Sequence, residues 1–382
     1  MYKSIILVFT ATIIGLSIAV DNGLGLVPQM GWNSWNHFHC DINETVIMES
    51  ALAMVTSGLK DAGYRYVNID DCWAVGRDDN GVIQADPIAF PNGIKYIADY
   101  VHSLGLLIGI YTDAGILTCQ KRPGSYGYEQ IDAQTYASWG IDYLKMDWCN
   151  TYLENPQERY TIMSKALNAT GRPIFFSLCN WGISEPWMWA MDIGNSWRTT
   201  GDIADTWTSM TVILDLQVPI TSFSGVGGWN DPDMLEVGNG GMTTTEYISH
   251  FSLWSLLSAP LIAGNDIRSI DNTTFSILTA MEVIAVNQDT LGRQGSLIKS
   301  INGKDQQIWA KPLADGSKAV ILLNRNDNES ATIQLQWGDI WESPSTSLIV
   351  RDLWAQQDID TFTGSYTATN IPPHGCVMLR VY

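Results

Sequence analysis

Carboxylates near the ends of apolar, strand-like runs are the residues of this chain best suited to catalysis. Asp147 ends IDYLKMD (141–147), and Asp202 lies near the end of SWRTTGDI (196–203). Two carboxyl groups on either side of one bond can hydrolyse a glycoside, because one attacks as an anion and the other supplies a proton. Lys145 shares a strand face with Asp147 and favours its ionised form. A structural ion pair is the alternative interpretation of these residues.

Further polar residues are expected around these two carboxylates. Asp70 and Asp71 end the run YRYVNIDD (64–71), and Arg198 lies four residues before Asp202. Two adjacent carboxylates repel each other and cap no evident helix, but they are good acceptors for sugar hydroxyls. The chain also contains 16 Trp and 15 Tyr residues, whose rings stack on the C–H faces of sugars or fill a core. This composition indicates carbohydrate as the ligand.

Other catalytic chemistries lack their sequence signals. His37 and His39 form an H-x-H near the end of the first expected strand, but a metal site needs further ligands at later strand ends. The remaining histidines, His102, His250 and His374, do not lie at such ends. The chain has no G-x-S-x-G, Walker or C-x-x-C motif. We therefore expect neither a metal nor a cofactor.

The elements that position these residues alternate between short apolar strands and amphipathic helices from Val27 to about Leu291. About eight such β/α units, beginning with PQMGWNSW (28–35), predict a (β/α)8 (TIM) barrel with its active site at the carboxyl ends of the strands. A doubly wound open sheet is the alternative, but its polar residues would cluster at fewer strand ends. Further strand ends are expected at VPITSFSG (218–225) and SAPLIAG (258–264).

The pattern changes after about Gly295. From there, short alternating strands are separated by turns that contain Gly, Asp, Asn and Pro. This pattern predicts a small antiparallel β-sandwich. We therefore expect an α/β chain with a catalytic barrel over residues 21–294 and a C-terminal β-sandwich over residues 295–382. No low-complexity linker separates the two parts, so we expect them to pack tightly.

Residues 1–20 predict a cleaved signal peptide. Lys3 precedes an apolar stretch that is too short to span a bilayer, and the small residues Ser17 and Ala19 suit a cleavage site. Entry into the secretory pathway is also indicated by four Asn-x-Ser/Thr sequons: Asn43, Asn168, Asn272 and Asn328. The net charge of −19 gives no electrostatic reason to bind nucleic acid. We expect a secreted or lysosomal protein without a membrane anchor, as a monomer or a homodimer.

Eight ordered motifs resemble those of the α-galactosidases of glycoside hydrolase family 27, in clan D. They are MGWNSW, IDDCW, ADP–FPNGI, GIYTDAG, YLKMDWCN, SWRTTGDI, GGWNDPDML and AVNQDTLGRQG, and they extend from about Gly23 to Gly295. The resemblance implies an exo-acting enzyme that removes terminal α-D-galactosyl residues from oligosaccharides, galactomannans or glycolipids, with retention of configuration. α-N-Acetylgalactosaminidase and β-L-arabinopyranosidase activities remain alternatives within the family, and a non-catalytic galactose-binding protein is a more distant one.

The resemblance also implies roles for single residues. Asp147 is implied to be the nucleophile and Asp202 the acid/base. We expect Lys145 to keep Asp147 ionised, while Asp202 holds a proton in the free enzyme. Contacts with the substrate are implied for Trp35, Asp70, Asp71, Tyr111, Lys145, Arg198 and Asp233. The implied disulfides are Cys40–Cys72 and Cys119–Cys149.

The sequence departs from the animal and plant members at one motif. It has Cys179-Asn180-Trp181 where those members have Cys-Glu-Trp. We expect Cys179 to be unpaired, and Cys179, Arg198 and Asp202 to contact the 2-hydroxyl; Asn180 is a further expected substrate contact. The bulky Ile183 and Asn180 are expected to exclude an acetamido group at C2, which favours galactose over N-acetylgalactosamine.

Overall fold

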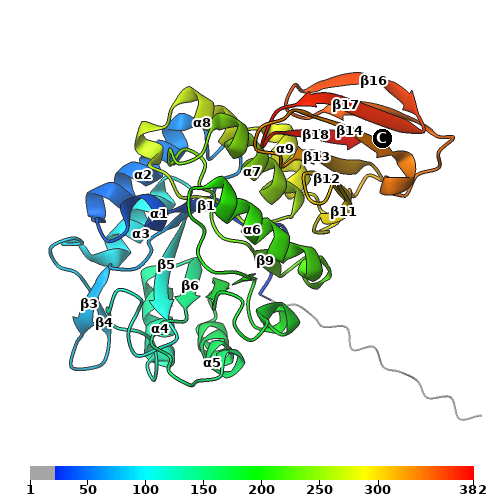
Figure 1. Cartoon of the computed structure of the whole chain (residues 1–382). Helices are drawn as coiled ribbons and strands as arrows, with labels where there is room; N and C mark the ends of the chain where they lie inside the picture. Colours follow the sequence, from blue (N-terminus) through cyan, green and yellow to red (C-terminus); the bar gives the residue numbers. More distant parts are fainter. Residues whose placement is uncertain (1–21) are drawn as a thin grey trace, which may run out of the picture.

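The computed structural model describes residues 22–382, so the expected signal peptide at residues 1–20 lies outside the described range. Figure 1 shows a barrel, coloured from blue to yellow, and a β-domain in orange and red that packs against one side of it. Within the described range, no helix is both long and apolar enough to cross a bilayer. The expected barrel followed by a C-terminal antiparallel domain is confirmed.

The barrel sheet within residues 22–382 contains eight parallel strands in the order β10-β1-β2-β5-β6-β7-β8-β9. Leu235, just after β9, pairs in parallel with Ala263 in β10, so the two ends of the sheet meet. Because all strands run in one direction, their carboxyl ends share one rim. The strands are β1 (Met30–Asn33), β2 (Tyr66–Asn68), β5 (Leu107–Asp113), β6 (Tyr143–Asp147), β7 (Phe175–Cys179), β8 (Ser196–Arg198), β9 (Trp229–Asp231) and β10 (Leu261–Ala263).

Helices surround this sheet and cover its outer face (Figure 1). Their apolar sides form the core with the strands; Ile97 and Val101 of α3, for example, are fully buried. A hairpin of β3 (Ala74–Arg77) and β4 (Ile83–Ala85) projects from the barrel. The helices are α1 (Trp35–Phe38), α2 (Glu44–Ser57), α3 (Gly93–Ser103), α4 (Glu129–Trp139), α5 (Pro156–Ala169), α6 (Trp207–Gln217), α7 (Thr244–Leu256), α8 (Asn272–Leu278) and α9 (Met281–Asn287).

One expected strand is wrong. The segment VPITSFSG forms a 3-10 helix over Val218–Phe223 instead of a strand end. Pro219 explains this difference, because its fixed φ and missing N–H suit the first turn of a helix and disfavour a central strand. The barrel strand at this point is β9, which the following GGWNDPD motif supplies. The other expected strand end, SAPLIAG, does contain β10.

The C-terminal domain consists of a six-stranded antiparallel sheet, in the order β11-β12-β13-β18-β15-β16, and the two-stranded sheet β14-β17. Neighbouring residues of β13 point to opposite faces. Val320 lies in the core between the two sheets, whereas Ile321 lies in the core that continues into the barrel. The larger sheet is therefore buried on both faces at β13, whereas β16 at its edge is mostly exposed. The strands are β11 (Ser296–Ile301), β12 (Gln306–Pro312), β13 (Lys318–Asn324), β14 (Ala331–Gln336), β15 (Ser347–Asp352), β16 (Gln357–Thr363), β17 (Ser365–Ile371) and β18 (Cys376–Val381).

The four sequons differ in how their asparagines are used. Asn168, Asn272 and Asn328 are exposed. Asn43 is half-buried, and its Oδ1 accepts a hydrogen bond from the Val46 N–H at 2.9 Å, which caps the start of α2. Glycosylation of these four sites stays a prediction, and the three exposed asparagines are the better acceptors.

Candidate active site

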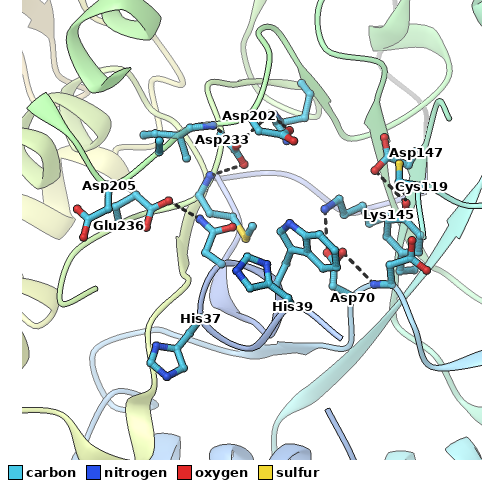
Figure 2. A pocket seen from close by; sticks show the side chains of 18 of the residues that line it. His37, His39, Asp70, Cys119, Lys145, Asp147, Asp202, Asp205, Asp233 and Glu236 are labelled. Carbon is cyan, nitrogen blue, oxygen red and sulfur yellow. Dashed lines mark hydrogen bonds and ion pairs between the residues drawn. The ribbon is translucent and has the colours of Figure 1, made fainter. Parts of the chain in front are cut away.

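A cavity of about 780 Å³ opens at the carboxyl ends of the barrel strands (Figure 2). Nine of the predicted site residues line it, and they come from segments far apart in the sequence: Trp35, Asp70, Asp71, Tyr111, Lys145, Asp147, Arg198, Asp202 and Asp233. The fold therefore brings the two proposed catalytic carboxylates into one cavity. Cys179 and Asn180 are not among the described residues that line it.

Asp147 is buried and held from two sides. It is the last residue of β6 and is 6% exposed. The Trp148 N–H donates to Oδ1 at 2.9 Å, and the Tyr111 hydroxyl, from the neighbouring strand β5, donates to Oδ2 at 3.0 Å. Burial raises the pKa of Asp147 to about 6, although the charge of Lys145 opposes this shift. The result is a rigid carboxyl group with a fixed direction.

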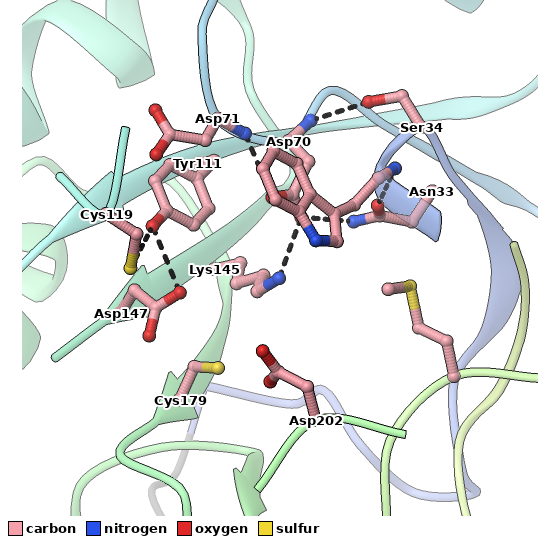
Figure 3. A network of polar contacts seen from close by, with 12 residues as sticks. Asn33, Ser34, Asp70, Asp71, Tyr111, Cys119, Lys145, Asp147, Cys179 and Asp202 are labelled. Atoms are coloured by element: carbon pink, nitrogen blue, oxygen red, sulfur yellow. Dashed lines mark hydrogen bonds and ion pairs between the residues drawn. The ribbon is translucent and has the colours of Figure 1, made fainter. Parts of the chain in front are cut away.

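Lys145 forms its ion pair with Asp70 (Figure 3). Its Nζ lies 2.8 Å from Asp70 Oδ2, which also accepts from Asn33 Nδ2 at 2.8 Å. The main-chain N–H of Asp70 donates to Ser34 Oγ at 3.0 Å. Burial alone would lower the pKa of Lys145, but the charge of Asp70 raises it well above its usual value. The lysine therefore stays charged in the cavity.

Two disulfides lie next to the site. They are Cys40–Cys72 and Cys119–Cys149. Cys72 directly follows Asp71, and Cys149 lies two residues after Asp147. The N–H of Gln120, the residue after Cys119, donates to Asp71 Oδ2 at 2.9 Å. The disulfides therefore tie together the loops that carry the predicted sugar acceptors and the predicted nucleophile.

On the other side of the cavity, Arg198 contacts Asp202, Asp233 and Cys179. Its Nη2 lies 3.0 Å from Asp202 Oδ1 and 2.9 Å from Asp233 Oδ2, and its Nη1 lies 3.6 Å from the thiol sulfur of Cys179. The Ile203 N–H also donates to Asp233 Oδ2, at 2.8 Å. Arg198 and Asp233 are buried, whereas the Asp202 side chain is 73% exposed. Asp202 is therefore the carboxyl group that meets solvent.

The order of the pKa values of Asp147 and Asp202 is the reverse of the expected one. We expected Asp147 to be the more acidic group and Asp202 to hold the proton. Burial instead raises the pKa of Asp147 to about 6. For Asp202, burial acts in the same direction, but the charge and hydrogen bond of Arg198 outweigh it and lower the pKa. The expectation rested on the charge of Lys145 and on repulsion between the two carboxylates, and it omitted the burial of Asp147 and the ion pair between Arg198 and Asp202.

The Cys179–Trp181 segment also needs a correction. Cys179 is unpaired and buried, and its thiol lies beside Arg198. Asn180 is fully buried, and its Nδ2 donates to the Ile183 carbonyl at 2.6 Å. This hydrogen bond stabilises the loop that contains both residues. Ile183 is 46% exposed and does not line the cavity, whereas Trp181 does. Exclusion of an acetamido group by Ile183 and Asn180 therefore stays a prediction.

Sequence reasoning missed several acidic residues in or near the cavity. Asp205 and Glu236 line it, and burial raises the pKa of Glu236 to about 7. Asp113 lies behind Asp147, fully buried, and accepts from the N–H groups of Gly115 at 2.7 Å and Cys149 at 2.9 Å. Burial, together with the charge of Asp147, raises the pKa of Asp113 to about 9. Its place at a strand end and within the GIYTDAG motif was the sequence signal for Asp113.

The protein is a (β/α)8 barrel with two carboxyl groups in a cavity at its strand ends. Donors and acceptors suited to hydroxyl groups surround them. This combination of fold and site is that of a glycoside hydrolase. Residues 27–289 match the family described as Alpha galactosidase A, and residues 303–381 match the Alpha galactosidase C-terminal beta sandwich domain. The chain belongs to the α-galactosidases of glycoside hydrolase family 27.

Individual relatives agree over nearly the whole chain. A Dictyostelium discoideum protein named "Probable alpha-galactosidase" is 67% identical over 95% of this chain and 94% of its own length. An α-galactosidase from Cyamopsis tetragonoloba is 55% identical over 94% of this chain and 87% of its own length. The crystal structure of α-galactosidase I from Mortierella vinacea superposes with a TM-score of 0.92 at 43% identity, covering 95% of this chain and 98% of that one.

Proposed function

We propose that this protein is a retaining exo-α-galactosidase in which Asp147 is the nucleophile and Asp202 the acid/base. The substrate is a terminal, non-reducing α-D-galactosyl group. The observation that carries the assignment of roles is the contrast between the two carboxyl groups. Asp147 is 6% exposed and hydrogen-bonded through both oxygens, whereas the Asp202 side chain is 73% exposed and held by one arginine.

This contrast fits what each role requires. A nucleophile must reach one carbon from one direction, so a fixed carboxylate at the base of the cavity suits it. An acid/base must first reach the leaving oxygen and then a water molecule, so a carboxyl group at the open side suits it. The reverse assignment would place the acid/base where neither a leaving group nor water can approach it easily.

The remaining residues would bind the galactosyl group. Asp70 and Asp71 present acceptor oxygens for the hydroxyls at C4 and C6, and Lys145 can donate to those at C3 and C4. Arg198, with Cys179 behind it, lies on the side of Asp202 and would contact the hydroxyl at C2. Trp35 offers a ring for the C–H face of the sugar.

The reaction would proceed in two displacements. A carboxylate oxygen of Asp147 bonds to C1 while the bond from C1 to the leaving oxygen breaks, and Asp202 gives that oxygen its proton. In the second step a water oxygen bonds to C1, Asp202 accepts the water proton, and the ester bond to Asp147 breaks. Each step inverts C1, so the first product is α-galactose.

The protonation order has a consequence for the pH dependence. The reactive form needs Asp147 ionised and Asp202 protonated, but in the free enzyme the single shared proton resides mainly on Asp147. The pair therefore has two singly protonated forms, and the reactive one, with the proton on Asp202, is the less populated. The pH dependence of kcat/KM should be bell-shaped, with an acidic optimum between the lowered pKa of Asp202 and the pKa of about 6 of Asp147.

The roles can be tested by substitution. Asp147→Ala should abolish turnover, and azide should restore some of it as β-galactosyl azide. Asp202→Ala should slow substrates with poor leaving groups far more than p-nitrophenyl α-galactoside. Asp79→Ala, at an exposed turn of the β3–β4 hairpin, is the matched control and should behave as the wild type. NMR of the first sugar released decides the stereochemistry, and β-galactose formed first contradicts the proposal.

The choice of sugar needs its own assay. Activity should be compared on the p-nitrophenyl derivatives of α-galactose, α-N-acetylgalactosamine and β-L-arabinopyranose. We expect the α-galactoside to give the highest kcat/KM, because the high-identity relatives are named α-galactosidases. Equal kcat/KM on the galactoside and either alternative would contradict this specificity.

We also propose that the protein passes through the secretory pathway, to the lysosome or to the outside of the cell. Two disulfides and three exposed sequons support this location. N-terminal sequencing of the mature protein should find residues 1–20 removed, and treatment with an N-glycan-removing enzyme should lower its mass. An intact Met1 on a protein without glycans contradicts the proposal.

A further inference from the structure

The acid/base proposed above lies in a segment without helix or strand. This segment, which we call the acid/base loop, covers residues 199–206 between β8 and α6. The Asp202 side chain is 73% exposed and is held by Arg198. One contact does not fix an exposed carboxyl group, so the direction of Asp202 depends on how the loop itself is held.

The first half of the acid/base loop is held by the neighbouring strand end. The Thr199 N–H donates to the Asp231 carbonyl at 2.9 Å, and the Ile203 N–H donates to Asp233 Oδ2 at 2.8 Å. Asp231 is the last residue of β9, and Asp233 lies two residues further on. These two hydrogen bonds tie the main chain on both sides of Asp202 to the rim of the barrel.

The second half of the loop is held through the side chain of Asp205. Its Oδ2 accepts from the Gly241 N–H at 2.5 Å and from the Tyr247 hydroxyl at 2.7 Å. A Cβ atom on Gly241 would lie 2.2 Å from the Asp205 carbonyl oxygen, so only glycine lets the two main chains approach this closely. Because Asp205 is three residues after Asp202, a shift of Asp205 would also shift the acid/base.

The donor that holds Asp205 is itself fixed. Tyr247 lies on α7 and is 7% exposed, and its hydroxyl accepts from the N–H groups of Gly240 at 2.6 Å and Met242 at 3.3 Å. The first turn of α7 is closed by a complete capping box. Burial, together with the hydrogen bond to Asp205, raises the pKa of Tyr247 to about 12, so the hydroxyl remains a donor at every working pH.

Direct contact with the substrate is the alternative role for Asp205, because this residue also lines the cavity. Figure 2 shows it on the side of the cavity away from Asp147 and Lys145. Its Oδ2 is already used by two donors of the protein, which join the acid/base loop to α7. This arrangement favours a role that acts through Asp202.

We propose that Asp205, held by Tyr247 and Gly241, is a positioning residue that sets the direction of the acid/base Asp202. The inference rests on the proposed function and deepens it. An acid must lie within hydrogen-bond reach of the leaving oxygen, so a loop displaced by about 1 Å would lose much of its acid catalysis. Attack by Asp147, which is held separately on β6, would be affected less.

The test uses two substrates that need the acid to different degrees. Methanol must be protonated as it leaves methyl α-galactoside, whereas p-nitrophenolate can leave its galactoside without a proton. Neither leaving group is a sugar, so a contact between Asp205 and a second sugar would not affect the comparison. The measured quantity is the ratio of kcat/KM for the p-nitrophenyl substrate to that for the methyl substrate.

We expect this ratio to rise about ten-fold in Asp205→Ala and in Tyr247→Phe, as loss of one or two hydrogen bonds predicts. Asp205→Asn keeps an oxygen that can accept from both donors, so its ratio should stay within about two-fold of the wild type. Asp61→Ala, at an exposed aspartate in the turn after α2, is the matched control and should keep the wild-type ratio.

The ratio does not depend on how much of a preparation is folded, because both substrates meet the same enzyme. A rise of at least about five-fold in Asp205→Ala, with Asp205→Asn within about two-fold of the wild type, supports the inference, and any other result overturns it. If Asp205→Ala does not fold, the same limit applies to Tyr247→Phe. Failure of the proposed function is distinct, because in that case Asp202→Ala itself leaves the ratio unchanged.

Discussion

Removal of the Tyr111 hydroxyl should change the pH dependence of the enzyme in a specific way. This hydroxyl donates to Asp147 Oδ2 at 3.0 Å, and burial raises the pKa of Tyr111 well above its usual value, so it stays a donor at every working pH. A hydrogen bond to a charged group contributes about 1.5–3 kcal/mol. Because one pKa unit corresponds to about 1.4 kcal/mol, Tyr111→Phe should raise the pKa of Asp147 by roughly one to two units.

Two effects on kcat/KM follow from this higher pKa. The alkaline limb of the profile, which reflects loss of the last proton from the pair, should move up by the same one to two units. The shared proton should also reside still more on Asp147, which reduces the reactive form with a protonated Asp202. The maximum of kcat/KM should therefore fall by about ten- to a hundred-fold.

The assay is kcat/KM for p-nitrophenyl α-galactoside, measured from about pH 3 to 9. Tyr96→Phe, at an exposed tyrosine on α3, serves as the control and should leave both the limbs and the maximum unchanged. A lower maximum with unmoved limbs would mean that Tyr111 contacts only the sugar. An alkaline limb that moves down would contradict the assignment of the pKa of about 6 to Asp147.

Three further outcomes are expected. Burial lowers the pKa of Lys311 to about 7. Between about pH 7 and 10.5 this lysine therefore binds a proton in the unfolded chain but not in the folded one. Its contribution to the free energy of unfolding of the wild type rises with pH across that range. Lys311→Met should therefore raise the melting temperature most below pH 7 and progressively less above it, and a gain independent of pH would contradict this. The double substitution Cys119→Ser and Cys149→Ser removes a disulfide that joins residues 30 positions apart. In denaturant titrations it should lower the free energy of unfolding by about 2–4 kcal/mol, and an unchanged midpoint would contradict this. Ile183→Ala together with Asn180→Ser should raise activity on the α-N-acetylgalactosaminide, because these two side chains are expected to exclude its acetamido group, and unchanged activity would contradict this.

The parts that the sequence predicted depend on local patterns. The end of β6 could be recognised because apolar residues lead directly into Lys145 and Asp147, which alternate onto one face. The strand at 218–225 could not be excluded as easily. Barrel strands here are as short as three residues, as in β9, and an apolar run of that length also suits one turn of a 3-10 helix.

Electrostatic details needed the fold. The pKa order of the catalytic pair depends on the burial of Asp147 and on the contact between Arg198 and Asp202, and neither follows from residue spacing. Glu236 lies just after the GGWNDPDML motif and is not part of it, and its partner Asn36 is 200 residues away in sequence, so residue spacing did not single it out. Long-range contacts of this kind shape the cavity wall and cannot be read from a single chain.

The burial of β13 on both faces limits how this protein can be divided. Ile321 and its neighbours cover a barrel surface near α7, and Glu246 of α7 lies 2.7 Å from His374 of the C-terminal domain. The same helix carries Tyr247, whose hydroxyl donates to Asp205 at the cavity. A barrel cut free at about residue 294 would expose an apolar face and loosen a helix that supports the cavity wall. Gene fusions and truncations should therefore keep both domains as one unit, with added segments placed at the chain ends.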